Sequence, residues 1–255
     1  RKSEAQVSAG KHRTMRAAKV EKANIALADA EARLRAEKSI RVELPGTAVP
    51  AGRTVLELDA RPRPVILRGP ERVALVGANG AGKTTLLEQI VHGGPEVLFR
   101  TDAIGYLPQR LDTLHDDATV LENIESVAPE SDPNEIRAQL ARFLIRGDNV
   151  NRPVAQLSGG ERFRVALARI LLADRPPQLL LLDEPTNSLD LASVSQLVDA
   201  IAAYRGALIL VSHDYTFLEQ LGLDRWLEVD PVAGLSERAI GHSGDTPNSL
   251  GATTL

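Results

Sequence analysis

The stretch GANGAGKTT, residues 77–85, decides the fold of this 255-residue chain. It follows the apolar run RVALV and precedes the helical run LLEQIV, so the pattern G-x-x-x-x-G-K-[ST] stands between a strand and a helix, as its chemistry requires. Gly77, Gly80 and Gly82 let the backbone curl so that N–H groups and the helix N-terminus face phosphate groups. The stretch therefore predicts a phosphate-binding loop.

The side chains at the end of this loop carry the chemistry of phosphate binding. Lys83 can reach the β- and γ-phosphates of a nucleotide, and the Thr84 hydroxyl can ligate Mg²⁺. The alternative is a glycine-rich turn with an incidental lysine, which the flanking strand and helix disfavour. The predicted nucleotide-binding residues are Gly77, Asn79, Gly80, Ala81, Gly82, Lys83, Thr84 and Thr85.

A second acidic motif, LLLLDEP at residues 179–185, follows an apolar run that is typical of a buried strand. Asp183 stands at the end of that run, where a carboxylate can ligate Mg²⁺ directly or through water. Glu184 follows it and can orient or deprotonate an attacking water molecule. The alternative is that one of these carboxylates only caps a helix N-terminus.

Three apolar runs, VALVG, LLLLD and ALILVS, are linked by helical stretches, which indicates buried parallel strands in a doubly wound α/β core. Shorter runs at residues 55–58, 65–67 and 73–76 are also typical of strands. Residues 113–150 look mostly helical, with breaks at Pro129, Pro133 and Gly147. With 43% apolar and 25% charged residues, the chain can bury a substantial core.

The composition excludes several classes of function. The chain has no cysteine, which rules out disulfides, thiolate metal sites and cysteine nucleophiles. No apolar run approaches the roughly 18 residues that a membrane crossing needs, so we predict no membrane-spanning segment and a cytoplasmic location. The sequence begins at Arg1 without an initiator methionine, which is typical of a piece of a longer protein.

Residues 1–41 form a basic segment, with 11 Lys and Arg against 5 Asp and Glu, whereas the remainder of the chain is acidic. No Gly or Pro interrupts residues 11–38, which predicts a helix of about 42 Å. Val20, Leu27 and Leu34 recur every seven residues, as in a coiled-coil seam. The last stretch, GHSGDTPNSLGATTL, is polar and is predicted to be a loose tail.

The motif LSGGE, residues 157–161, opens an amphipathic helix. Ser158 supplies a hydroxyl, while Gly159 and Gly160 expose backbone amides at the helix N-terminus, an arrangement suited to a second phosphate contact. Glu161 stands three residues after Ser158, so a capping box describes the same residues. A cap alone does not require two adjacent glycines.

Together, GANGAGKTT, LSGGE and LLLLDEPTNSLD resemble an ATP-binding-cassette (ABC) nucleotide-binding domain over about residues 42–230. This resemblance implies a P-loop NTPase fold with a mixed core sheet, a helical subdomain at about residues 110–157, and ATP with Mg²⁺ as ligands. It also implies that Gln109 in IGYLPQR senses Mg²⁺ and water, that Asp190 contacts a second domain, and that His213 in LVSHD is a switch residue.

The resemblance further implies that the signature residues Ser158, Gly159, Gly160 and Glu161 act in trans. In this family the signature loop closes over ATP held by another cassette, so one chain holds two halves of two different sites. The partner is a second ABC domain, fused in a longer protein or supplied by a copy of this chain. Three domains are predicted: a linker helix at 1–41, the cassette at 42–235 and a tail at 236–255.

The sequences EPTNSLD and LSGGERFRVALARILL, with the basic leading helix, resemble the ABC-F subfamily. That subfamily acts on the ribosome, in translation or in antibiotic-resistance protection, and its linker approaches transfer RNA. Ser188 departs from the usual histidine of its motif. The candidate phosphate contacts of the linker are Lys11, His12, Arg13, Arg16, Lys19 and Lys22. The alternatives are a solvated charged helix and, for the whole protein, an ATPase subunit of a transporter.

The expected adenine site also departs from the family pattern. Cassette domains usually stack adenine on an aromatic residue well before the P-loop, but the first aromatic residue of this chain is Phe99. Arg53 or Arg61 can lie against the base instead, or selectivity between nucleotides is loose.

Overall fold

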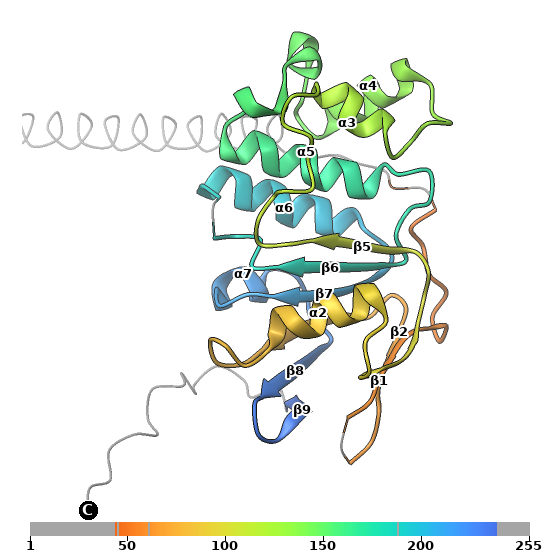
Figure 1. The fold of residues 1–255 in the computed structure, drawn as a ribbon, viewed down its shortest axis with the longest axis vertical. Coiled ribbons are helices and arrows are strands. Elements are labelled where there is room, and N and C mark those ends of the chain that lie inside the picture. The colour runs from red at the N-terminus through yellow and green to blue at the C-terminus, as the bar shows by residue number, and fades with distance from the viewer. Residues whose placement is uncertain (1–43, 45, 61, 188, 239–255) are drawn as a thin grey trace, which may run out of the picture. The chain divides into compact units, whose positions relative to one another are not determined.

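The computed structural model describes residues 44, 46–60, 62–187 and 189–238 (Figure 1). These residues form two β-sheets with helices packed around them. The larger sheet has the strand order β5-β6-β7-β3-β8-β9. All neighbouring strands in it run parallel except β8 and β9, which are antiparallel. Its strands are β3 (Arg72–Val76), β5 (Ile104–Leu107), β6 (Leu179–Asp183), β7 (Ala207–Val211), β8 (Arg225–Asp230) and β9 (Gly234–Arg238). This arrangement confirms the predicted α/β class with a mixed core sheet.

A smaller antiparallel sheet, in the order β2-β1-β4, accompanies the large one. Its strands are β1 (Thr54–Leu58), β2 (Val65–Arg68) and β4 (Val97–Arg100). Branched and other apolar side chains alternate along β1 and β2, and their inward members are fully or nearly fully buried. The apolar runs at residues 55–58 and 65–67 therefore form strands, as predicted.

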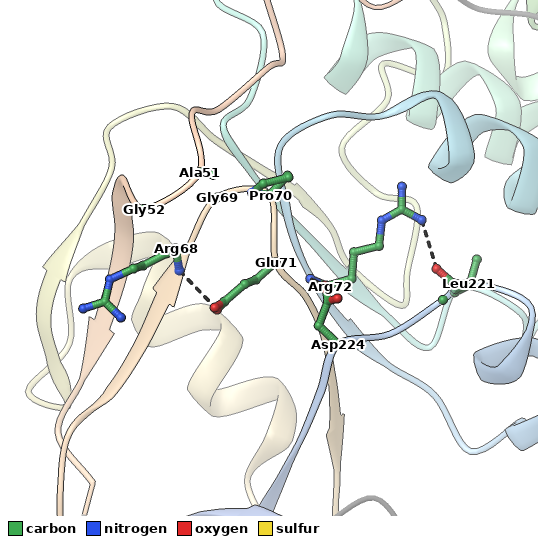
Figure 2. A pocket seen from close by; sticks show the side chains of 10 residues that line it. Ala51, Gly52, Arg68, Gly69, Pro70, Glu71, Arg72, Leu221 and Asp224 are labelled. Atoms are coloured by element: carbon green, nitrogen blue, oxygen red, sulfur yellow. Dashed lines mark hydrogen bonds between the residues drawn. The ribbon is translucent and has the colours of Figure 1, made fainter.

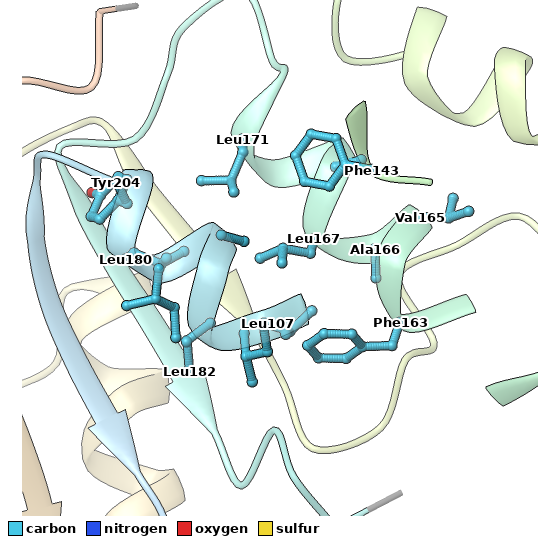
Figure 3. Packing of buried hydrophobic residues seen from close by; sticks show 14 of the residues in the cluster. Leu107, Phe143, Phe163, Val165, Ala166, Leu167, Leu171, Leu180, Leu182 and Tyr204 are labelled. Atoms are coloured by element: carbon cyan, nitrogen blue, oxygen red, sulfur yellow. The ribbon is translucent and has the colours of Figure 1, made fainter. Parts of the chain in front are cut away.

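Helices cover the large sheet on both faces, and the alternation of residues within each strand shows which helix covers which face. In β6, Leu180 and Leu182 belong to the cluster that includes α5 (Gly159–Leu171) and α6 (Leu191–Ala203). Leu179 and Leu181 belong to the cluster that includes α2 (Lys83–His92). Figure 1 shows α5 and α6 lying together, apart from α2, and Figure 3 shows Phe163 and Leu167 packed toward Leu182 and Leu107.

The register of the parallel strands brings their carboxyl ends to one edge of the sheet. Leu75 lies opposite Val211, Val211 opposite Asp183, and Leu182 opposite Leu107. Residues that follow these positions therefore gather at a single edge, which we call the carboxyl edge. The edge at which the same strands begin is called the amino edge.

Between β5 and α5 the chain forms a mostly helical region. It contains α3 (Val120–Glu125), α4 (Pro133–Arg142) and the 3₁₀ helices η1 (Gly147–Asn151) and η2 (Val154–Gln156). Thr119 and Glu122 form a capping box at α3, and Asp132 caps α4, which has Pro133 at its first turn. The fully buried Asn123 bonds the main chain of His115 in both directions, which fixes the loop before α3.

The chain enters this fold through a leading segment, residues 44 and 46–52, that is docked on the amino edge. The buried Thr47 hydroxyl donates to the Leu44 carbonyl at 2.9 Å, and the Val49 N–H donates to the Arg205 carbonyl at 3.3 Å. Val49 also packs so closely on Gly69 that a Cβ there would lie 2.2 Å from Val49 Cγ1. The predicted helix at 11–38 and the tail from 239 onward lie outside the described residues.

No helix among the described residues combines the length and the apolar character that a membrane crossing requires.

Candidate functional site

The predicted phosphate loop joins β3 to α2 at the carboxyl edge, and its glycines are required by the backbone. Gly77 has φ 148°, and a Cβ on it would lie 2.4 Å from the Val229 carbonyl oxygen of β8. Gly82, at the N-cap of α2, has φ 102°. Both conformations are open to glycine and strained for other residues. Asn79, Gly80, Thr84 and Thr85 are exposed on the loop, while Ala81 is buried beneath it.

Lys83 is the buried cation of this loop. Its side chain curls back so that Nζ donates to the carbonyl oxygens of Gly77 at 2.9 Å and Ala78 at 3.1 Å. Within the described part of the chain it forms no ion pair with a carboxylate. A nearly buried ammonium without a counter-charge is poised to bind an anion, because burial strengthens the attraction between opposite charges.

Thr84 and Asp183 come together beside the loop, as the two motifs predict for a Mg²⁺ site. The Thr84 hydroxyl donates to Asp183 Oδ2 at 2.7 Å, and Asp183 is 2% exposed at the end of β6. Hydroxyl and carboxylate oxygens are hard ligands that suit Mg²⁺, which binds few protein groups and keeps waters and substrate oxygens. The described residues hold no cluster of three or more His, Asp or Glu that could bind a metal by themselves.

Glu184 and His213 form a second pair at the same edge. Glu184 has φ 48°, a left-handed conformation unusual for its residue type, and its N–H donates to the Val211 carbonyl at 2.9 Å. His213 Nε2 lies 3.1 Å from Glu184 Oε1, close enough for an ion pair. The two groups lack the alignment of a hydrogen bond, so Glu184 Oε1 is buried without a hydrogen-bond donor from the described residues. This carboxylate is free to accept a proton from a ligand.

Gln109 is exposed two residues beyond the end of β5, on the same edge as Asp183. The structure thus brings the loop and the predicted catalytic residues Glu184, His213 and Gln109 to one edge of one sheet. Sequence motifs separated by up to 130 residues converge there because parallel strands share the direction of their ends.

The signature residues stand at the start of α5. Ser158 caps the helix: its Oγ accepts from the Glu161 N–H at 3.3 Å, and Glu161 Oε2 accepts from the Ser158 N–H at 2.8 Å. The bond from the Ser158 backbone holds the pKa of Glu161 below its usual range, and the charge of Arg152 contributes. Ser158 and Gly159 are nevertheless exposed to solvent. Helices α5 and α2 cover opposite faces of the sheet. The signature residues at the start of α5 therefore lie apart from Lys83 at the start of α2.

Asp190, the predicted dimer contact, caps α6 and is linked to the signature through Ser193. The Ser193 N–H donates to Asp190 Oδ1 at 2.8 Å, which lowers the pKa of Asp190. A Cβ on Gly160 would lie 2.6 Å from Ser193 Oγ, so the second signature glycine also permits close approach of α5 to α6. Sequence reasoning missed Ser193; its spacing of three after Asp190 is the usual signal of a cap.

Arg164 lies beneath these two segments and was also missed. Its guanidinium donates to Gln196 Oε1 at 3.1 Å, and its Nε is buried with no hydrogen-bond partner among the described residues. Burial lowers the pKa of Arg164, and the charges of Glu161 and Asp190 oppose that effect. It therefore couples the signature and the start of α6 electrostatically.

A cavity of about 530 Å³ lies elsewhere, at the amino edge (Figure 2). Arg72 and Asp224, two of the charged residues that line it, have partners within the chain. The Arg72 guanidinium donates to the carbonyl oxygens of Leu221, Ile201 and Tyr204, and Asp224 accepts from the Arg72 N–H. These bonds leave Arg72 and Asp224 little capacity for a ligand, so the cavity is a poor candidate for chemistry.

No stacking platform for adenine is evident among the described residues. Phe99 lies on β4 and is 46% exposed, and Arg53 is exposed before β1. Arg61 lies outside the described residues, so stacking on it stays a prediction.

Comparison with protein families agrees with this geometry. Residues 65–187, a little under half of the chain, match the family described as ABC transporter. The "Probable ATP-binding protein YheS" of Haemophilus influenzae is 42% identical over 149 residues, which cover 56% of this chain and 23% of that protein. "ABC transporter F family member 2" of Arabidopsis thaliana is 39% identical over 168 residues, covering 62% of this chain and 24% of that protein.

A solved structure titled "RNase-L Inhibitor" superposes with a TM-score of 0.54 at 26% identity, covering 74% of this chain and 39% of that chain. The present chain covers 23% and 24% of the length of the two curated relatives named above.

Proposed function

We propose that this chain, which is similar to the ATP-binding-cassette nucleotide-binding domains of ABC-F proteins, binds ATP and hydrolyses it to ADP and phosphate. The single observation that supports this most strongly is the convergence of three pairs at the carboxyl edge. Lys83 faces the phosphate loop, Thr84 bonds Asp183, and Glu184 stands beside His213.

Each pair has a distinct role in the proposed reaction. The loop amides and the Lys83 ammonium bind the β- and γ-phosphates and stabilise their negative charge. Glu184 accepts a proton from a water molecule as that water attacks the γ-phosphorus, and the bond from the γ-phosphorus to the bridging oxygen breaks. His213 and Gln109 orient the water and the γ-phosphate. ADP, phosphate and a proton are the products.

Thr84 and Asp183 are the residues that would hold Mg²⁺, with Gln109 as a further oxygen ligand. When bound, the ion offsets the charge of the phosphate oxygens. The buried Asp183 has its partner in Thr84, so this side of the site is preorganised by the chain itself.

We further propose that two cassettes complete each site. Ser158 and Gly159 are exposed on the face of the sheet away from α2, and the next residue, Gly160, lies close to Ser193, which bonds Asp190. This arrangement suits a signature that closes over the nucleotide of a second ABC domain. A nucleotide-bound structure tests it: Ser158 touching the ATP held by Lys83 of the same domain would contradict the proposal.

The substitution Glu184→Gln tests the hydrolytic role. We expect ATP turnover to fall by roughly 10²–10⁴-fold, because the base is lost while the shape of the side chain is kept. ATP binding should remain, since Glu184 does not bond the loop. Glu219→Gln, on an exposed carboxylate of α7 (Tyr215–Glu219), is the matched control. Turnover of Glu184→Gln near the wild-type rate would reject Glu184 as the base.

The finer proposal is that the protein acts on the ribosome and transfer RNA, in translation or antibiotic protection. It rests on the ABC-F resemblance and on the basic residues of 11–22, which lie outside the described residues. Ribosome co-sedimentation with charge reversal at Lys11, Arg13, Arg16 and Lys19 tests it. Unchanged, salt-sensitive binding would contradict a role for these residues, and capture of a membrane permease instead would favour a transporter subunit.

A further inference from the structure

The segment that carries His213, residues 212–214, joins β7 to α7 and is fixed at both ends by its own polar groups. The buried Ser212 Oγ accepts from the Asp214 N–H at 3.1 Å. Asp214 Oδ1 in turn accepts from the Phe217 N–H at 3.0 Å, which caps α7. His213 itself is 54% exposed at its side chain, and its Nε2 lies 3.1 Å from Glu184 Oε1. These bonds fix the local backbone conformation of residues 212–214. The position of the segment relative to the rest of the fold depends on other contacts.

One such contact is an aromatic stack two residues after His213. The rings of Tyr215 and Trp226 have centroids 5.9 Å apart and planes inclined by 11°. Helix α7 has five residues, too few to hold its own position, so it depends on side chains that anchor it to its surroundings. Phe217 and Leu218 are buried in the core, while Tyr215 is 45% exposed and makes its ring contact at the surface.

The strand on which Tyr215 rests also touches the phosphate loop. Trp226 belongs to β8, which pairs in parallel with β3, and Trp226 lies opposite Ala74. Three residues farther along β8, the Val229 carbonyl approaches Gly77 so closely that no Cβ fits between them. One strand therefore contacts the loop that would grip the triphosphate and the segment that bears the switch histidine.

From this geometry we propose that the Tyr215–Trp226 stack is a positioning element. It holds His213 beside Glu184 and fixes the position of residues 212–214 relative to the phosphate loop. The proposal rests on the ATP hydrolysis proposed above. Neither ring is a catalytic residue, because both act through the placement of His213. Removal of the stack should therefore slow the chemical step and leave nucleotide binding intact.

Four variants test the stack. Tyr215→Leu and Trp226→Leu remove it, whereas Tyr215→Phe and Trp226→Phe keep two aromatic rings. We expect kcat for ATP to fall roughly 10-fold in each leucine variant with KM within about twofold, and both phenylalanine variants to stay within about threefold of wild type. Because Trp226 is the chain's single tryptophan, quenching of its fluorescence by acrylamide checks that Tyr215→Leu uncovers the ring.

A second readout does not depend on hydrolysis. The imidazole NMR resonances of His213, assigned with a His213→Gln variant, should shift in Tyr215→Leu and stay in place in Tyr215→Phe. If kcat and these resonances are unchanged in Tyr215→Leu, or if Tyr215→Phe falls as far, the positioning role is overturned. If the wild-type chain does not hydrolyse ATP even when paired with a second cassette, the proposed function fails while the resonances still decide the role of the stack.

Discussion

The two edges of the large sheet both carry charged side chains, yet they use them in opposite ways. At the amino edge, the Arg72 guanidinium donates to three carbonyl oxygens and Asp224 accepts from the Arg72 N–H. At the carboxyl edge, the Lys83 ammonium has only loop carbonyls as partners, and Glu184 Oε1 has no hydrogen-bond donor among the described residues. A cavity of about 530 Å³ lies at the amino edge, beside groups that are bonded within the chain. Unused hydrogen-bonding capacity, rather than a cavity, therefore marks the edge that is proposed to bind a ligand.

The largest effect expected from this contrast is on Lys83. Lys83→Ala should weaken ATP binding by at least about 100-fold, because charge-assisted bonds to two phosphates are lost. The free energy of unfolding in urea should change little, because Gly77 is only half-buried and Ala78 is exposed, so water can bond the carbonyl oxygens that lose the Lys83 donor. Binding is measured by titration with a fluorescent ATP analogue, and Arg68→Ala at the amino edge serves as the control. A variant that binds ATP normally but unfolds readily would break the comparison between the edges.

The opposite outcome is expected for Arg72. Arg72→Ala should lower the free energy of unfolding by about 3 kcal/mol, because it leaves the carbonyl oxygens of Leu221, Ile201 and Tyr204 without their donor. Under conditions in which the variant is folded, its ATP turnover should stay within about twofold of wild type. Urea unfolding and steady-state kinetics on the same sample check both statements. A large loss of turnover in the folded variant would show that the amino edge takes part in catalysis.

The smallest effect concerns the signature cap and depends on pH. The folded state lowers the pKa of Glu161, chiefly through the bond from the Ser158 backbone, so the folded state favours the ionised carboxylate. Its stabilisation is complete above the ordinary glutamate value of about 4.3 and is lost as the pH falls through the lower folded value. Glu161→Gln should cost about 1 kcal/mol or less at pH 7 and progressively less in acid. A cost that is constant from pH 7 to pH 3 would contradict the cap.

The motifs with fixed local spacing were the easiest part of this fold to predict. The pattern GANGAGKTT predicts a loop with a strand before it and a helix after it. The apolar runs in LLLLD and ALILV form the buried central strands β6 and β7. Parallel strands then place Glu184 near His213, although 29 residues separate them in the sequence. The helical interpretation of residues 113–150 agreed with α3 and α4, whose caps are local signals.

What escaped prediction depends on contacts between distant residues with no pattern of their own. Strand β8, RWLEVD, is half polar, and nothing in its sequence indicates that Trp226 stacks on Tyr215 or that Val229 presses on Gly77. The bond between Ser193 and Asp190 is local, but its proximity to Gly160 follows from helix packing alone. Such contacts arise from the tertiary fold, which residue spacing does not encode.

The docked leading segment has a consequence for where changes in it are felt. Val49 holds the chain at the amino edge through its bond to the Arg205 carbonyl and its contact with Gly69, and the Thr47 hydroxyl closes the turn back to Leu44. This segment thus lies against the start of the sheet, whereas the phosphate loop follows the opposite end of β3. A substitution that loosens Val49 should therefore disturb the edge on which it packs and leave the shape of the phosphate loop unaltered.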